Sequence, residues 1–232
     1  MTQAASAGLA VAERLVVAMS NALEGASEEL CELDASAGDG DHGLAMAAAA
    51  KSIRSEISKH RPADLAGLVD LVAGQFGAVG GAMGALTYVL VQALREAAAE
   101  SKAHLSAFEI ARVLAVAEET VSAFGGARRG DKTIVDAIAA AREAAENSAR
   151  VGRSPGQTLL DAAAAARKGA SSTAEMVARI GRASRLGELS RGTVDPGARS
   201  FAIALNALAD AYAAEGGVLS SSSTASRSSG SR

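Results

Sequence analysis

Apolar residues recur at helical spacing along most of the chain. Leu9, Ala12, Val16 and Met19 follow one another at intervals of three and four residues, which places them on one face of a helix. Similar patterns predict eight helices, and no run of residues shows the alternation that indicates a strand. We therefore expect an all-α fold of antiparallel helices joined by short connections. The predicted helices lie near residues 5–24, 42–60, 63–79, 82–101, 106–124, 131–149, 155–171 and 197–215.

Residues at the predicted helix ends support these limits. Pro62, Pro155 and Pro196 are expected just inside helix starts, where the missing N–H of proline leaves no helical bond unmade. Ser106 and Glu109 have the spacing of a capping box. Glycine-rich or charged segments predict loops near 34–43, 79–84, 125–133 and 181–197. If these loops gather at one end of the helices, they form a site.

Composition narrows the class of protein. Aromatic residues make up 3% of the 232 residues and Trp is absent, so Ala, Leu, Val and Ile must build the core. The 23 basic and 26 acidic residues give a net charge of −3, which supplies no positive field for nucleic acid. Cys31 is the single cysteine, which excludes an intramolecular disulfide and a cysteine-cluster metal site.

The ends of the chain and its longest apolar runs predict where the protein resides. Residues 1–21 lack the basic-then-apolar order of a signal peptide, and no stretch reaches the roughly 18 apolar residues of a membrane span. We expect a cytoplasmic protein with no membrane partner. Residues 1–216 are predicted to form one helical domain, and the Ser-rich residues 217–232 a flexible tail.

The strongest chemical signal is the acidic loop at 34–43. Asp34, Asp39 and Asp41 lie within eight residues and are interleaved with glycines that let the chain turn tightly. Converging carboxylates repel one another unless a cation lies between them, and their hard oxygen ligands suit Mg²⁺ or Ca²⁺. The alternative is an acidic loop that only forms turns and caps helices.

Three familiar motifs match parts of the chain only by letter. Gly38, Gly40 and Gly43 have the spacing of a dinucleotide fingerprint, but no strand precedes them and aspartates fill the spaces between them. An EF-hand beginning at Asp39 would place Ala50 where a bidentate Glu is required. The run at 125–133 resembles a P-loop, but it carries an inserted Asp and follows no strand.

Two further segments are candidates for binding an oxyanion. The small residues at 80–84 open a helix and leave backbone N–H groups uncovered, which attracts phosphate or else permits close helix packing. Arg182, in a glycine-rich loop, is either a phosphate clamp or an ordinary surface charge. His42 follows the acids directly, and its role as a hydrogen-bonding residue, a ligand or a supporting group stays open.

Taken in order, these segments resemble one known family, the nucleotide-binding L subunit or L domain of dihydroxyacetone kinases. The resemblance covers residues from about 5 to 215. The matching stretches are Leu33-Asp34, Gly38-Asp39-Gly40-Asp41-His42-Gly43-Leu44, Gly80-Gly81, Gly130-Asp131-Lys132-Thr133 with Asp136, Ser172-Thr173 with Met176 and Ala178, Gly181-Arg182-Ala183-Ser184 with Leu186-Gly187, and Asp195-Pro196-Gly197.

The resemblance implies a barrel of eight antiparallel helices with the nucleotide at one end. It implies that Asp34, Asp39 and Asp41 hold two Mg²⁺ ions that bridge the phosphates of ADP or ATP. Two positions depart from the family: Ala45 replaces an Asn of some relatives and Met83 a Ser or Thr of many, and neither side chain can donate to phosphate. The nucleotide contacts that the resemblance implies are His42, Gly43, Leu44, Ala45, Ala82, Met83, Gly125, Ile134, Arg182, Asp195, Pro196 and Gly197.

The resemblance also implies an activity and its partners. The chain would be a phosphotransferase subunit that passes a phosphoryl group to an alcohol group of a short-chain ketose, such as dihydroxyacetone or erythrulose. A separate K subunit would hold the ketose. Either ATP exchanges as a substrate, or ADP stays bound and a phosphoenolpyruvate-dependent phosphocarrier subunit rephosphorylates it. The sequence leaves open which mode applies, whether the chain forms a homodimer, and whether it is instead a non-catalytic helical regulator or scaffold.

Overall fold

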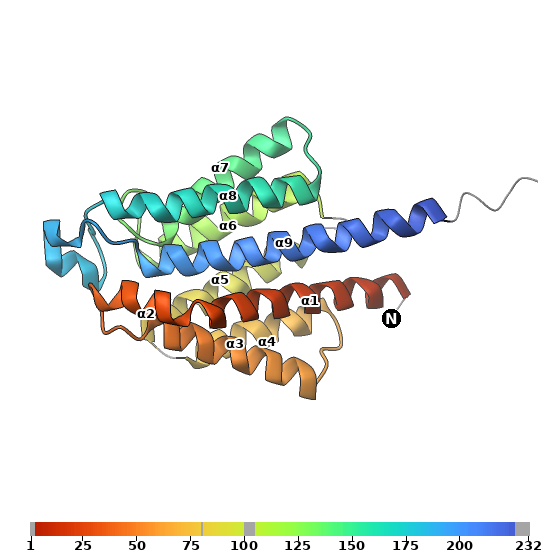
Figure 1. Cartoon of the computed structure of the whole chain (residues 1–232), viewed down its shortest axis with the longest axis horizontal. Helices are drawn as coiled ribbons and strands as arrows, with labels where there is room; N and C mark the ends of the chain where they lie inside the picture. The colour runs from red at the N-terminus through yellow and green to blue at the C-terminus, as the bar shows by residue number, and fades with distance from the viewer. Residues whose placement is uncertain (1–2, 80, 100–104, 226–232) are drawn as a thin grey trace, which may run out of the picture.

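The expected helices form a closed ring in the computed structural model, which describes residues 3–79, 81–99 and 105–225 (Figure 1). Each long helix packs against the next, and α9 returns to α1, so that eight antiparallel helices enclose a common interior. A short helix, α2, continues from the end of α1 and packs on α3 and α9 (Figure 1). The helices are α1 (Gln3–Gly25), α2 (Ser27–Ala35), α3 (His42–Lys59), α4 (Leu65–Ala78), α5 (Gly81–Ala99), α6 (Ala107–Gly125), α7 (Ile134–Arg150), α8 (Pro155–Ser172) and α9 (Pro196–Ala225).

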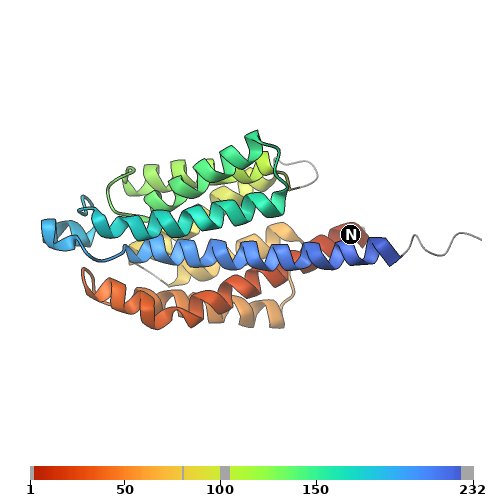
Figure 2. The same ribbon diagram turned by 45° about the horizontal axis from the view of Figure 1, so that its top comes forward.

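The all-α prediction is therefore confirmed: in the described ranges every regular element is a helix, including two short 3₁₀ segments, Thr173–Glu175 and Arg182–Ser190. The turned view in Figure 2 shows α9 running along the whole barrel beside α8. The structure differs from the sequence expectation in several places. The α2 helix was not predicted, α7 begins at Ile134 rather than near 131, and α9 extends to Ala225. The proposed domain limit at residue 216 stays a prediction.

Side-chain caps explain where several helices begin. Ser106 and Glu109 form the expected capping box, with the Ser106 hydroxyl accepting from Glu109 N at 3.2 Å. Pro155 opens α8 as expected. The prediction for Pro62 was wrong, because α4 begins three residues later at Leu65, where the Asp64 carboxylate caps the helix.

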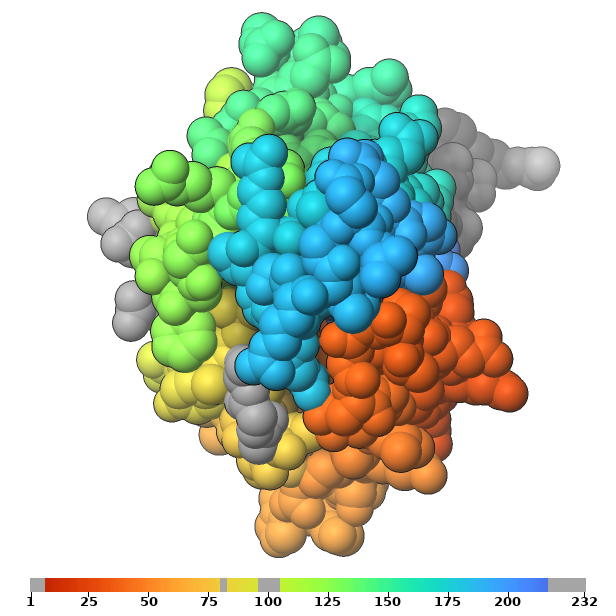
Figure 3. Space-filling view, turned by 90° about the vertical axis from the view of Figure 1, so that its left-hand side faces the viewer, coloured from red at the N-terminus to blue at the C-terminus, as the bar shows by residue number. Residues whose placement is uncertain are grey.

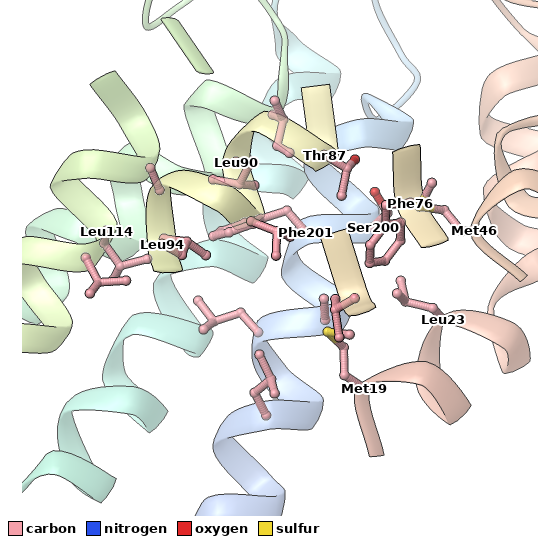
Figure 4. Close-up of a pocket in the computed structure, with 18 of the residues that line it drawn as sticks. Met19, Leu23, Met46, Phe76, Thr87, Leu90, Leu94, Leu114, Ser200 and Phe201 are labelled. Atoms are coloured by element: carbon pink, nitrogen blue, oxygen red, sulfur yellow. The ribbon is translucent and has the colours of Figure 1, made fainter. Parts of the chain in front are cut away.

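Two kinds of packing hold the ring together. Alanines with almost no exposed surface line the contact between α7 and α8, and Gly169 lies against Ala140 where a Cβ would collide at 2.8 Å. Small side chains let these helices approach closely. Elsewhere in the interior, larger side chains from several helices surround a cavity of about 300 Å³ (Figure 4). Residues that line it include Met19, Met46, Phe76, Leu90, Leu114 and Phe201.

Within the described residues, none of the helices has both the length and the apolar character needed to cross a lipid bilayer.

Candidate functional site

The loops that the sequence marked as chemical meet at one end of the barrel. Seen from this end, the segment that follows α8 lies across the face, with the α2–α3 loop on one side and the α6–α7 loop on the other (Figure 3). Arg182 of that segment pairs with Asp39, and the backbone N–H of Arg179 donates to Asp131 O at 3.2 Å. Residues that lie far apart in sequence therefore share one surface.

The three aspartates converge as predicted. One carboxylate oxygen from each of Asp34, Asp39 and Asp41 lies within 4.8 Å of the others. Asp34 is buried at the end of α2, whereas Asp39 and Asp41 are exposed in the loop. Three hard oxygen donors at this separation fit a divalent cation such as Mg²⁺.

Backbone groups fix the orientation of the Asp34 carboxylate. Its Oδ2 atom accepts hydrogen bonds from the N–H groups of Gly40 at 3.0 Å, Asp41 at 3.1 Å and His42 at 3.4 Å. The chain can wrap the carboxylate in this way because Gly40 adopts a φ of 76°, which favours glycine. The buried acid therefore organises the loop that carries the two exposed acids.

Gly38 leaves the space that the Asp34 carboxylate occupies. A Cβ at this position would overlap Asp34 Oδ1 and lie 2.9 Å from Asp34 Cγ. The backbone of Gly38 does not have a positive φ, so the requirement for glycine here comes from the carboxylate and not from backbone strain.

The charges of the cluster act on one another. The hydrogen bond from Arg182 lowers the pKa of Asp39, whereas the hydrogen bond with Asp39 and the negative charges of Asp39 and Asp34 raise the pKa of Asp41. A carboxyl with a raised pKa next to two other acids is the arrangement that a bound cation relieves. Arg182 already supplies one positive charge to this cluster.

His42 and its neighbours begin α3 beside the acids. The His42 ring is buried, which lowers its pKa, and its Nε2 atom lies 3.1 Å from Ser200 Oγ of α9. Leu44, in contrast, is 65% exposed. Gly43 permits close contact between α2 and α3, because a Cβ there would overlap the Ser27 carbonyl oxygen.

Two of the predicted nucleotide contacts, Ala45 and Ala82, are alanines near helix starts. The N–H of Ala45 donates to Asp41 O at 2.9 Å within the helix, and its methyl group packs against the apolar cluster of the barrel. The side chain of Ala82 and the whole of Gly80 lie outside the described residues.

The turn at 195–197 joins two other parts of the predicted site. Asp195 Oδ1 accepts from Ala198 N at 2.7 Å and so caps α9, while burial raises the pKa of Asp195 to about 6. A Cβ at Gly197 would lie 3.7 Å from Met83 Cε and 3.7 Å from Ile134 Cβ. The turn, the start of α5 and the start of α7 are thus in contact.

Gly125 is the last residue of α6 and is exposed at the same end of the barrel. The site also contains three buried residues that were not among the predicted nucleotide contacts, although Lys132 and Thr173 lie in the stretches that match the family. Lys132, Thr173 and Ser200 are buried beside the loops, and their hydrogen bonds connect one loop to another. Lys132 belongs to the run that resembles a P-loop, yet its ammonium group binds backbone carbonyls inside the protein.

Comparisons with known proteins identify the family to which the chain is similar. The family model described as the DAK2 domain matches residues 36–210. The chain is 37% identical over 190 residues to L-erythrulose 1-kinase of Mycolicibacterium smegmatis, covering 78% of this chain and 32% of that protein. It is 33% identical over 187 residues to the ADP-binding subunit DhaL of the PEP-dependent dihydroxyacetone kinase of Escherichia coli K12, covering 79% of this chain and 87% of the subunit.

A solved structure shares the fold. The dihydroxyacetone kinase of C. freundii in complex with AMP-PNP and Mg²⁺ superimposes with a TM-score of 0.67 at 27% sequence identity, covering 87% of this chain and 34% of that one. The chain spans about a third of the length of this enzyme and of the erythrulose kinase, and most of the length of the ADP-binding subunit.

Proposed function

The chain belongs to the DAK2 domain family, and from this premise we propose that it binds an adenine nucleotide through Mg²⁺ and presents its phosphate for transfer to a ketose. The main support for this proposal is that carboxylate oxygens of Asp34, Asp39 and Asp41 lie within 4.8 Å of one another. They lie at the end of the barrel that also holds Arg182 and the 195–197 turn. In this proposal Asp34, Asp39 and Asp41 hold two Mg²⁺ ions. The nucleotide is ADP or ATP.

The residues around the acids have separate tasks in this proposal. Arg182 reaches the cluster from the opposite loop, so that its guanidinium can bind a phosphate oxygen next to the metal ligands. The start of α3 offers the backbone of His42, Gly43, Leu44 and Ala45 close to Asp41. Phosphoryl transfer needs charge neutralisation and in-line positioning, and bound Mg²⁺ would supply the first.

The remaining predicted residues enclose the rest of the nucleotide. We assign this role to the contact between the 195–197 turn, Met83 and Ile134, together with Gly125 on the rim. Met83 and Ile134 also line the apolar cavity, so they offer the nucleotide an apolar surface rather than hydrogen bonds. Ala82 is assigned by its position at the start of α5.

The acceptor is proposed to lie on a partner. The erythrulose kinase and the C. freundii enzyme are about three times as long as the matched region, while the E. coli relative is a separate ADP-binding subunit. We infer that a K subunit holds dihydroxyacetone or an erythrulose-like ketose. The phosphoryl donor is either exchangeable ATP or bound ADP that a phosphoenolpyruvate-dependent phosphocarrier subunit recharges. The cytoplasmic location and a homodimer stay predictions.

Calorimetry tests the proposed binding directly. The protein is titrated with ADP and with ATP, in Mg²⁺ and in excess EDTA. We expect binding that requires Mg²⁺ and that is lost in Asp39→Asn, whereas exposed Asp210→Asn binds as the unchanged protein does. Absence of binding heat with both nucleotides in Mg²⁺ would contradict the proposal and favour a regulator or scaffold of the same fold.

Reconstitution then separates the two phosphate sources. The chain is mixed with a K subunit and a ketose, and phosphorylated sugar is measured with ATP alone, or with phosphoenolpyruvate and its phosphocarrier proteins. Turnover with ATP alone identifies an exchangeable nucleotide. Turnover only with phosphoenolpyruvate identifies resident ADP, and no turnover in either mixture contradicts the kinase role.

A further inference from the structure

A buried lysine connects three backbone segments beneath the site. Lys132 has only 4% of its surface exposed, and its Nζ atom donates to Thr173 O at 2.7 Å and to Thr193 O at 2.5 Å. These two carbonyls mark the start and the end of the segment that crosses the end of the barrel, which we call the 173–193 segment. One ammonium group therefore closes a loop of about twenty residues.

The backbone of Lys132 supports this inward placement. Its φ is 63°, and among the described residues it is the one non-glycine residue with a positive φ. Residues other than glycine rarely adopt a positive φ, and such a backbone conformation persists where the surrounding structure imposes it. Lys132 lies in the loop between the end of α6 and the start of α7. With this backbone conformation its side chain lies under the 173–193 segment.

Other bonds join the ends of the same segment. Gly192 N donates to Ala174 O at 2.8 Å, and Asp195 N donates to Thr173 Oγ1 at 2.9 Å. The Lys132 ammonium joins the two ends of the segment from the α6–α7 loop, and Asp131 O of the same loop accepts from Arg179 N inside the segment at 3.2 Å. These bonds tie the 173–193 segment and the adjoining 195–197 turn to the α6–α7 loop.

The segment carries Arg182 to the acids. Arg182 lies in its middle and pairs with Asp39 across the end of the barrel, in a contact between residues 143 positions apart in sequence. A fixed base of the segment limits the positions that the Arg182 guanidinium can take. We propose that Lys132 is a positioning residue of the nucleotide site, which holds the 173–193 segment so that Arg182 meets the acid cluster. This inference rests on the proposed nucleotide binding.

A double-mutant cycle tests the inference. The affinity for ADP in Mg²⁺ is measured by calorimetry for the unchanged protein, Lys132→Met, Arg182→Gln and the double variant. We expect Lys132→Met to weaken binding about tenfold, Arg182→Gln to weaken it about tenfold alone, and Arg182→Gln to add less than twofold in the Lys132→Met background. A residue that only stabilises the fold would leave the two effects multiplicative.

A stability control accompanies the cycle. Ser148 is buried near the opposite end of α7, where its hydroxyl donates to Asp161 Oδ2 at 2.7 Å. Ser148→Ala is expected to lower the melting temperature without changing the affinity for ADP. If Lys132→Met does not fold, Lys132→Gln, whose amide can still donate to one carbonyl, takes its place in the cycle.

The outcomes distinguish this inference from the function on which it rests. If the unchanged protein binds no nucleotide, the proposed function fails. If it binds and Lys132→Met binds equally well, or if Arg182→Gln has the same effect in both backgrounds, the positioning role of Lys132 is refuted.

Discussion

Gly38→Ala tests whether the buried aspartate organises the acid cluster. The added methyl group would overlap Asp34 Oδ1 and lie 2.9 Å from Asp34 Cγ, so the carboxylate must move by about 1 Å to restore an ordinary contact of at least 3.4 Å. Such a movement breaks one or two of the hydrogen bonds that Asp34 Oδ2 accepts from the backbone at 3.0 to 3.4 Å.

The magnitude follows from those bonds. A hydrogen bond to a charged group contributes about 1.5–3 kcal/mol, so the loss of one or two bonds, partly offset by water, lowers the free energy of unfolding by about 2–4 kcal/mol. For a chain of this size, each kcal/mol shifts the melting temperature by roughly 2–4 °C. The displaced carboxylate should also weaken Mg²⁺-dependent ADP binding at least tenfold.

Thermal unfolding and calorimetry on the same preparation measure both effects. Gly74→Ala is the matched control, because nothing lies within 4 Å of a Cβ at that position in α4, and alanine should stabilise the helix by roughly 0.5–1 kcal/mol. If Gly38→Ala melts and binds as the unchanged protein does, the carboxylate is not held as the structure indicates and the reasoning is refuted.

Three further predictions concern charge, pH and helix capping. Asp41→Asn should weaken Mg²⁺-dependent ADP binding at least tenfold, measured by calorimetry. The pKa of Asp195 is about 6, against about 3.9 for an unfolded Asp. At this carboxyl the folded chain therefore binds more protons between these values, so the free energy of unfolding of the unchanged protein should fall relative to that of Asp195→Asn as pH rises from 4 to 6, by at most about 3 kcal/mol. Ser106→Ala should lower the free energy of unfolding by about 1 kcal/mol in urea.

Each of these three predictions has a control variant and a result that would contradict it. Asp210→Asn changes another exposed carboxylate, on α9, and should leave ADP binding unchanged, so an equal loss in both variants would disprove a local role for Asp41. Parallel stability curves for the unchanged protein and Asp195→Asn from pH 4 to 6 would disprove the raised pKa. Ser171→Ala removes an exposed hydroxyl near a helix end, and Ser106→Ala must cost more than this control.

The helices were predicted well because local signals agree along the chain, whereas the closed barrel was implied by the family resemblance. Alanine-rich periodic runs, the Ser106 capping box and the prolines at 155 and 196 act over a few residues and need no tertiary information. The α2 helix was not predicted because it has nine residues, four of them acidic, and buries only Leu30 and Asp34. Its helical state follows from packing on α3 and α9, which periodicity does not report.

The site was predictable where its residues lie close in sequence or match a motif. Asp34, Asp39 and Asp41 fall within one loop, and their convergence followed from the intervening glycines. The links of Lys132 to carbonyls 41 and 61 residues away, and of His42 to Ser200 at a separation of 158 residues, depend on how helices close the barrel. No local pattern carries that information.

Different helices of the barrel should exchange their amide hydrogens at different rates. The α7–α8 contact is lined by alanines and a glycine that leave no room between the backbones, whereas α4 and α5 border the cavity of about 300 Å³. Loosely filled regions exchange their amide hydrogens through local openings, and densely filled regions through global unfolding. Deuterium uptake should therefore begin in α4 and α5 and reach the middle of α7 and α8 last, which would make the α7–α8 contact the most slowly opening part of the barrel.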